Sequence, residues 1–432
     1  MAIDEVIAKK RDGLELSTEE ISRVVRGYSR GQVADSQMAA LLMAIVLRGM
    51  TPQESADLTF AMAESGERLD LSAISGTKVD KHSTGGVGDK TTLVVAPLVA
   101  SFGVPVPKMS GRALGHTGGT IDKLESVPGL TTDLPPERFV RQVAEIGVAI
   151  AAQTDQMVPA DKKIYALRDA TATVESIPLI ASSIMSKKLA VGADAIVLDV
   201  KAGHGGFMPD VESACTLGAA MVDIGLRAGK RTVALVTRME EPLGTAVGDA
   251  VELVEAVETL AGRGTADFVE LCEIVAGHML CLGGAAPSPQ EGRNSAQLNL
   301  ASGAGLEKLE EMIVAQGGCR EAVRDPNKLM GETDHIPVEV ERQGYVAAIN
   351  ARRIGLALRD LKALAGERKR TCGVLLQKKT GDAIAGEPVA TLLVPAGLRD
   401  LSARAVSQVQ GAFEVAESAP VPPSMLAAVV LP

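Results

Sequence analysis

The chain has 432 residues, of which 46% are hydrophobic and 23% are charged, and its formal net charge at pH 7 is −10. This length exceeds what one ordinary hydrophobic core supports, so we expect two or three domains. An acidic chain lacks the basic surface that nucleic-acid binding requires, which excludes a general nucleic-acid-binding protein.

Five cysteines, scattered along the chain and odd in number, indicate a reduced, cytoplasmic protein rather than a disulfide-stabilised one. The first residues include Asp4 and Glu5 and form no apolar signal segment. The longest apolar run, residues 38–47, is about half as long as a membrane span, and we interpret it as a buried helix. We therefore expect no membrane role.

The chain up to about residue 65 has the pattern of consecutive helices. Ser17, followed by Glu19 and Glu20, predicts a helix start with acidic residues in the first turn. Thr51 followed by Pro52 predicts another start, because proline is favoured in the first turn of a helix. This part is expected to be an all-helical domain.

Beyond about residue 77, short β-branched runs alternate with helical runs, which predicts a mostly parallel sheet with helical crossovers. The expected strands cover residues 78–80, 104–109, 149–152, 195–200 and 232–237. The last part of the chain, residues 345–432, changes to short strands and turns. The predicted fold class is α/β: a small all-helical domain, a large α/β domain with a mixed, mostly parallel sheet, and a C-terminal α+β domain.

The segment 79–92 is the most informative one for function. Three glycines at positions 85, 86 and 88 allow backbone N–H groups to turn inward, and the following helix start adds further N–H groups. Lys81 supplies a positive charge, and Ser83 and Thr92 supply hydroxyls. This composition predicts a phosphate site. A Walker A loop fits poorly, because Asp89 stands directly before Lys90 where that pattern requires glycine. A dinucleotide fingerprint fits poorly as well, because Gly86-Val87-Gly88 is followed by Asp89, Lys90 and Thr91 without the third glycine.

A second loop of similar composition covers residues 107–125 and also follows a predicted strand. Because parallel strands present their carboxyl ends at one edge of the sheet, we expect both loops to meet at a single ligand site. The alternative interpretation, that both glycine loops are purely structural turns, does not explain why the two share the same composition.

The motifs Lys-His-Ser-Thr-Gly-Gly-Val-Gly-Asp, residues 81–89, and Ser-Gly-Arg-Ala-Leu-Gly-His-Thr-Gly-Gly-Thr-Ile-Asp-Lys-Leu-Glu, residues 110–125, resemble the thymidine and pyrimidine-nucleoside phosphorylases. Residues 160–171 and 180–188 are similar to the same family, and the resemblance runs over nearly the whole chain. Several long motifs in one order are more specific than any single glycine loop.

The resemblance implies a domain arrangement and a reaction. Residues 1–68 and 160–192 would form a helical domain on the base-binding side, which also forms a homodimer. Residues 69–159 and 193–335 would form the α/β phosphate-binding domain. The implied reaction is reversible phosphorolysis of uridine, thymidine or deoxyuridine to free base and α-D-(deoxy)ribose 1-phosphate in pyrimidine metabolism, with phosphate as co-substrate and no organic cofactor.

The resemblance also implies roles for particular residues. His82 would be catalytic, by stabilising the departing base at the pyrimidine O2. The implied phosphate ligands are Lys81, Ser83, Thr92, Lys108, Ser110 and Thr120. The implied base ligands are Tyr165, Arg168, Ser183 and Lys187. Within each helix these lie three or four residues apart and so share a face.

A bound potassium ion is implied as well. The matching ligand positions are Gly88, Lys90, Leu243, Ala246 and Glu255. Some relatives have threonine where this chain has Lys90. A lysine is harmless there if the backbone carbonyl is the ligand, and it weakens the site if the side chain is.

Several alternatives stay open on the sequence alone. A strict thymidine phosphorylase tends to have an uncharged residue where this chain has Lys108, whose ammonium could bind a ribose 2′-hydroxyl. An anthranilate-type phosphoribosyltransferase shares the fold but would need Mg²⁺. A non-catalytic nucleoside-binding or secreted signalling protein is disfavoured by the intact residues 81–83. His116 and His204 receive no assigned role.

Overall fold

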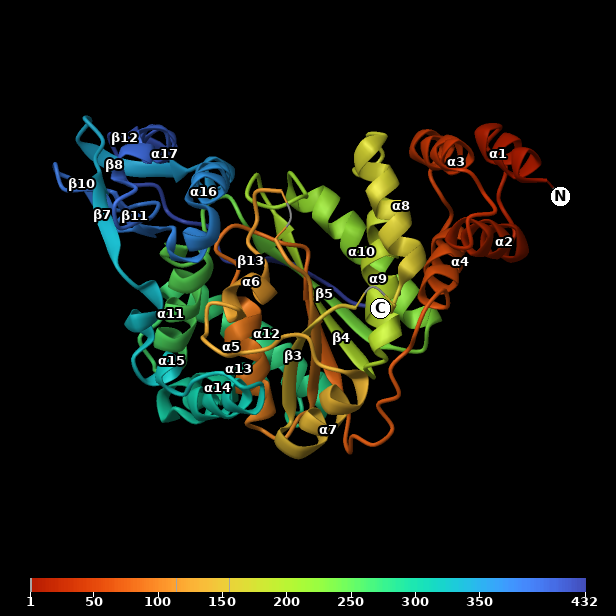
Figure 1. Ribbon diagram of the computed structural model, residues 1–432, viewed down its shortest axis with the longest axis horizontal. Coiled ribbons are helices and arrows are strands. Elements are labelled where there is room, and N and C mark those ends of the chain that lie inside the picture. The colour runs from red at the N-terminus through yellow and green to blue at the C-terminus, as the bar shows by residue number, and fades with distance from the viewer. Residues whose placement is uncertain (1, 114, 155) are drawn as a thin grey trace.

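The computed structural model describes residues 2–113, 115–154 and 156–432. A bundle of helices forms one end of the molecule, at the right of Figure 1. It consists of α1 (Ile3–Arg11), α2 (Thr18–Ser29), α3 (Asp35–Arg48), α4 (Pro52–Ala63), α8 (Pro159–Ala170) and α9 (Ile177–Val191). Ser17 and Thr51 are the N-caps of α2 and α4, and each forms a capping box with a glutamate three residues later. Both helix starts expected from the sequence are confirmed.

The central part is an α/β domain. Its strands are β1 (Val79–Ser83), β2 (Val106–Ser110), β3 (Val148–Ala152), β4 (Ala195–Ala202), β5 (Arg231–Arg238) and β13 (Leu426–Val430). The strand order is β1-β4-β5-β13 in one sheet and β2-β3 in another, and only the β13–β5 pair is antiparallel. The two sheets are linked where the Val79 N–H donates to the Pro105 carbonyl at 3.0 Å. The expected mixed, mostly parallel sheet is confirmed.

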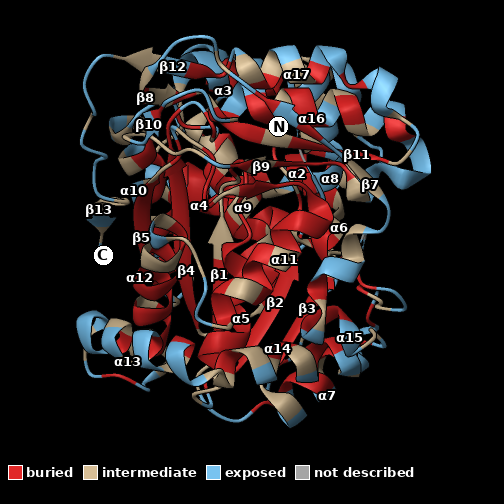
Figure 2. Cartoon of the chain, turned by 90° about the vertical axis from the view of Figure 1, so that its left-hand side faces the viewer, coloured by how far each residue is buried: buried red, intermediate tan, exposed pale blue. Residues whose placement is uncertain are grey.

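Helices cover this sheet on both faces (Figure 1). They are α5 (Thr91–Ala100), α6 (Thr120–Leu124), α7 (Pro136–Ile146), α10 (Val211–Arg227), α11 (Asp249–Leu260), α12 (Ala266–Gly283), α13 (Pro289–Ser302), α14 (Ala304–Ala315) and α15 (Glu321–Arg324). Every residue of β4 and α5 is buried, and Figure 2 shows buried residues concentrated in the strands and the helices beside them. Strands buried on both faces read as apolar runs, as in residues 195–198 of β4, after which the buried charges Asp199 and Lys201 interrupt the pattern.

The C-terminal part has two antiparallel sheets, in the orders β6-β9-β11-β7 and β10-β8-β12. Its strands are β6 (Ala246–Val247), β7 (Thr333–Val338), β8 (Gly344–Ile349), β9 (Gly373–Leu376), β10 (Ala383–Ile384), β11 (Ala390–Pro395) and β12 (Phe413–Ala416). Its helices are α16 (Ala351–Ala365) and α17 (Ala403–Gln410), with short 3₁₀ turns at Pro326–Met330, Gly366–Thr371 and Arg399–Leu401.

The strand pairing moves the domain boundaries that the sequence suggested. β7 begins at residue 333 and pairs with β11, so residues 333–335 belong to the C-terminal part rather than to the α/β domain. Conversely, β13 pairs with β5, so residues 426–430 complete the α/β sheet instead of the C-terminal domain. Strand pairs of this kind join segments that are far apart in the sequence. A short apolar run predicts a strand, but it does not predict with which other strand it pairs.

The helical bundle and the α/β domain share apolar packing. Ala181, Met185 and Leu189 of α9 lie in one core with Ile196 and Leu198 of β4. In the described part of the chain, no helix is long and apolar enough to cross a membrane.

Candidate active site

The site lies where β1 and β2 end. β1 finishes at Ser83 and is paired in parallel with β4, so the glycine loop after β1 begins at the carboxyl edge of the sheet. Gly85 and Gly88 have φ angles of 98° and 74°, which side chains rarely adopt, and a Cβ on Gly88 would approach the Leu243 carbonyl to 2.7 Å. The loop then enters the N-terminus of α5, so its N–H groups and the helix dipole favour an anion.

Lys81 is a buried ammonium at this edge. Its Nζ lies 3.1 Å from Asp199 Oδ2, and Lys201 Nζ lies 2.9 Å from the same oxygen. Neither ammonium has a well-directed hydrogen bond among the described residues, so both retain donors for a ligand. Burial alone would lower the pKa of Lys81, but the charges of Asp89 and Asp199 raise it above its ordinary value. Lys81 is therefore charged and suited to phosphate.

The loop is held in shape from within by Asp89. Its carboxylate accepts a short hydrogen bond from the Ser83 hydroxyl and another, of 3.2 Å, from the Thr91 N–H. Ser83 Oγ in turn accepts from the Gly85 N–H at 3.2 Å. Burial opposes ionisation of Asp89, but Lys81, Lys201 and Lys123 together hold its pKa well below the usual range. Ser83 thus both shapes the loop and presents an oxygen near Lys81.

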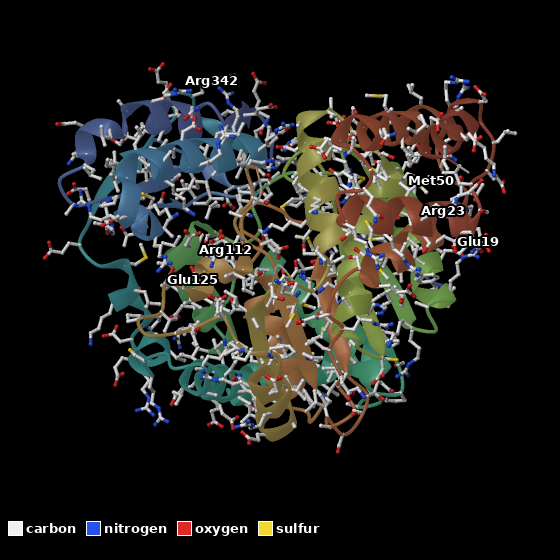
Figure 3. The ribbon with its side chains drawn as sticks, turned by 45° about the vertical axis from the view of Figure 1, so that its right-hand side comes forward. Glu19, Arg23, Met50, Arg112, Glu125 and Arg342 are labelled. Atoms are coloured by element: carbon white, nitrogen blue, oxygen red, sulfur yellow. The ribbon has the colours of Figure 1, made fainter. Side chains whose placement is uncertain are left out.

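The second loop contributes Ser110, which is buried at the end of β2, and Thr120, which opens α6. Its outer turn is fixed by Arg112, which donates to Glu125 at 2.9 and 2.7 Å, and Figure 3 shows these two side chains facing one another. The pKa of Arg112 is raised by this hydrogen-bonded pair. Arg112 is more than half exposed and paired, so the structure uses it to support the loop rather than to hold an anion.

His82 lies between the phosphate loop and the helical bundle. Its pKa is lowered well below the ordinary value, first by burial and then by the charges of Lys188, Lys108, Lys81 and Lys187. These four lysines come from β1, β2 and α9, so the structure gathers predicted phosphate and base ligands around one imidazole. Within the described ranges no residue forms a hydrogen bond with the His82 ring, and His82 is a neutral N–H donor available to a ligand.

Lys108 and Lys188 share a buried carboxylate. Lys188 Nζ lies 2.8 Å from Asp80 Oδ2, whereas Lys108 Nζ lies 3.9 Å from Asp80 Oδ1 and donates to the Met109 carbonyl at 2.9 Å. Burial and the nearby Lys188 charge lower the pKa of Lys108 well below its ordinary value. Lys108 is consequently the less firmly paired of the two, and an additional polar partner would stabilise it.

The predicted base ligands lie on α8 and α9. Lys187 pairs with Asp161 through a short contact and donates to Ser183 Oγ at 2.9 Å, so the expected shared face is confirmed. The Arg168 guanidinium carbon lies 5.5 Å from the Tyr165 ring centroid. Arg168 also donates to the carbonyls of Thr173, Leu179 and Val174 at 3.2, 3.1 and 2.6 Å. It is therefore rigidly held, with two of its five N–H groups still unused.

The expected potassium ligands also come together, but around a lysine. Lys90 Nζ donates to the Leu243 carbonyl at 2.5 Å and to the Ala246 carbonyl at 3.1 Å, and it pairs with Glu255. With this side chain in place, the set does not fit a potassium ion. No group of three or more His, Cys, Asp or Glu residues that could hold a metal occurs within residues 2–113, 115–154 and 156–432.

Two further histidines, His116 and His204, lie in glycine-containing loops. His116 Nε2 lies 3.2 Å from the Gly205 carbonyl and the ring packs against Phe207, whereas His204 is exposed. The sequence reasoning missed Asp80, Lys188, Asp199 and Lys201. The one available signal was charge within the apolar strand β4, since buried charges need partners.

Two family models match the chain, which gives the class of protein. The helical bundle domain of the glycosyl transferase family matches residues 4–66, and the a/b domain of the same family matches residues 75–306. The fold resembles that of anthranilate phosphoribosyltransferase from Thermus thermophilus, with a TM-score of 0.58, 24% identity, and coverage of 72% of this chain and 98% of that one. That likeness concerns the fold alone.

Curated relatives are more specific. The chain is 51% identical to the pyrimidine-nucleoside phosphorylase of Geobacillus stearothermophilus and 49% identical to that of Bacillus subtilis, each over 91% of this chain and 92% of the relative. The chain therefore belongs to the pyrimidine-nucleoside phosphorylase branch of the glycosyl transferase family, and the resemblance expected from the motifs is confirmed.

Proposed function

We propose that this protein catalyses the reversible phosphorolysis of pyrimidine nucleosides to free base and α-D-(deoxy)ribose 1-phosphate. The observation that carries the proposal is the placement of neutral His82 between two groups of cations. Lys81 and the loop N–H groups form the anion site on one side, and Lys187 with Ser183 faces it from α9. Relatives named pyrimidine-nucleoside phosphorylase at about half identity support the same reaction.

The residues present supply what this reaction needs. A phosphate oxygen attacks C1′ of the sugar as the bond from C1′ to the base nitrogen breaks, and the electron pair of that bond stays with the base. Phosphate beside Lys81 is positioned for this attack. The departing base gains negative charge, which the His82 N–H and the cations of α9 stabilise. The buried lysines act in a site of low dielectric, where such stabilisation is strongest.

The environment of Lys108 supports activity on both ribose and deoxyribose nucleosides. Its ammonium is buried beside Asp80 and only loosely paired, so a ribose 2′-hydroxyl would give it a further hydrogen-bond partner. We infer that uridine is a substrate as well as thymidine and deoxyuridine. A strict thymidine enzyme is the outcome in which this inference fails.

The testing experiment measures free base released from uridine and from thymidine, each with and without phosphate, in metal-free buffer. Phosphate-dependent release from both is expected. Release from thymidine alone would keep the reaction and refute the broad specificity. Release from neither, with transfer from phosphoribosyl pyrophosphate when Mg²⁺ is added, would instead favour a phosphoribosyltransferase.

We also propose a cytoplasmic homodimer formed through the helical bundle. Most of the apolar face of α2 packs inside the bundle, where Val25 and Tyr28 are buried. On α3, by contrast, Met43 and Leu47 are exposed, and Leu47 has 74% of its surface accessible. Sedimentation of the wild type and of a Leu47→Glu variant tests this surface, since the variant should be monomeric.

A further inference from the structure

A completely buried ammonium group, that of Lys90, binds the segment 242–246. The Lys90 side chain is completely buried, and its Nζ contacts the carbonyls of Leu243 and Ala246 and the Glu255 carboxylate. The Nζ atom also lies 4.9 Å from the centroid of the Phe268 ring, within the range of a cation–π contact. Two carbonyls, a carboxylate and an aromatic face form an environment that selects a monovalent cation.

The Glu255 carboxylate makes this environment negative. It accepts from the Thr245 N–H and the Ala246 N–H at 2.8 Å each, and from the Thr245 hydroxyl at 3.0 Å. A buried carboxylate requires a positive charge nearby, and the Lys90 ammonium pairs with it through a short contact.

A metal cation would have no place beside Lys90. Three of the residues expected to hold potassium, Leu243, Ala246 and Glu255, contact the ammonium instead. Of the other three carbonyls of the segment, those of Pro242 and Gly244 accept from Lys379 at 2.5 and 3.0 Å, and that of Thr245 accepts from the Leu376 N–H at 2.8 Å. A second cation within a few ångströms of Lys90 would be repelled strongly in such a buried site.

The ammonium is also coupled to the phosphate loop. Lys90 follows directly after Asp89, whose carboxylate binds Ser83 and the Thr91 N–H. Gly88 packs against the Leu243 carbonyl so closely that a Cβ would clash. The cation at Lys90 therefore joins the end of the phosphate loop to segment 242–246 and to α11.

We propose that Lys90 is the resident cation of this site: its ammonium takes the place of a monovalent metal ion, so the protein needs no potassium. Lys90 is a positioning residue, because it acts on phosphate through the loop that contains Ser83 and Asp89. The proposal does not rest on the identity of the nucleoside.

The first test compares thermal unfolding of the wild type in potassium chloride and in choline chloride at equal ionic strength. The unfolding temperature should be the same in both salts. Choline is too large for the cage, so a higher temperature in potassium would show binding of the metal ion to the folded wild type and would overturn the proposal. This measurement needs no variant and no substrate.

The second test creates the metal site. In Lys90→Thr the ammonium is lost, and a hydroxyl oxygen joins the two carbonyls and Glu255. The unfolding temperature of this variant should rise by about 2 to 5 °C between choline chloride and about 100 mM potassium chloride. Its KM for phosphate should fall with potassium while its KM for nucleoside stays unchanged, a split that general destabilisation would not give.

Lys90→Met is the matched control, because it removes the same charge and adds no oxygen ligand. It should unfold at a lower temperature than the wild type and respond less to potassium than Lys90→Thr. A folded Lys90→Thr variant without any potassium response would overturn the proposal, because the vacated atoms would then not form a cation site. If Lys90→Thr does not fold, the comparison of the unfolding temperatures of the wild type in the two salts still tests the proposal.

Discussion

The Lys188 ammonium lies 2.8 Å from the Asp80 carboxylate, and this buried ion pair joins α9 of the helical bundle to β1 of the α/β sheet. Lys188 also donates to the Met109 carbonyl of β2 at 3.2 Å. The same lysine contributes to the low pKa of His82. One side chain therefore docks α9 on the α/β sheet and, together with burial and three other lysines, lowers the pKa of the nearby imidazole.

Replacing Lys188 should destabilise the protein strongly. Lys188→Met leaves Asp80 buried without its closest partner, and we expect a loss of about 3–5 kcal/mol in the free energy of unfolding. Urea unfolding of the wild type and the variant measures this loss. The double variant Asp80→Asn with Lys188→Met should recover part of it, since the uncompensated carboxylate is removed; the recovery is incomplete because Lys108 also loses its carboxylate neighbour. Equal stability of the single and double variants would argue against the pair.

His82 should act as a neutral hydrogen-bond donor. Because burial and the nearby lysines lower its pKa well below the ordinary value, the imidazole loses its proton at a lower pH than an ordinary histidine does. We therefore expect kcat/KM to show no decline from His82 between pH 6 and pH 8. A steady loss of activity as the pH rises through 6.5, absent in a His82→Asn variant, would instead identify a proton-donating histidine.

Substitutions of His82 should also distinguish hydrogen-bond donation from proton donation. His82→Ala removes the donor and should lower kcat/KM by about 10²–10³, the usual effect of losing one donor to a developing charge. His82→Asn keeps an N–H donor and should lose less. Steady-state kinetics of both variants at one pH measures the difference, and equal losses would contradict a hydrogen-bonding role.

Lys81→Met should act chiefly on phosphate. The variant removes a buried charge that has unused donors, so we expect kcat/KM for phosphate to fall by about 10²–10³. Asp199 keeps Lys201 as a partner at 2.9 Å, which limits the effect on folding. Circular dichroism checks the fold. A variant that is fully folded and has normal phosphate kinetics would remove Lys81 from the site.

Lys108→Met tests the choice of sugar. If Lys108 binds the ribose 2′-hydroxyl, the variant should lose more activity on uridine than on thymidine, by about one to two orders of magnitude in the ratio of kcat/KM values. Kinetics with both nucleosides at saturating phosphate gives this ratio. Equal losses on the two substrates would mean that the lysine serves phosphate or the fold instead.

Local chemistry made part of this structure predictable. Ser17 and Thr51 cap helices through contacts three residues away, and the glycines after β1 are needed where φ is positive. Ser183 and Lys187 meet because they are four residues apart on one helix. Each of these features depends on a short stretch of sequence, so the sequence alone was sufficient to predict it.

The contacts that could not be predicted join distant segments. Asp80 and Lys188 are 108 residues apart, and Lys90 lies 153 residues from Leu243. The partners of Lys90 include backbone carbonyls, which every residue has, so no residue type marks them. Arg112 lies in the second glycine-rich loop, yet its guanidinium pairs with Glu125. The sequence predicts which charges exist, whereas the tertiary pairing decides which of them remain for ligands.

The pairing of β13 with β5 has a consequence for synthesis of the chain. Until residues 426–430 emerge from the ribosome, β5 is an open edge with unpaired N–H and C=O groups. Domains that form during translation normally close in order from the N-terminus, but here the α/β sheet is completed by β13, which follows every other described strand along the chain. A nascent chain that has completed both phosphate loops therefore still carries an unprotected β-edge, where chaperone binding is most needed.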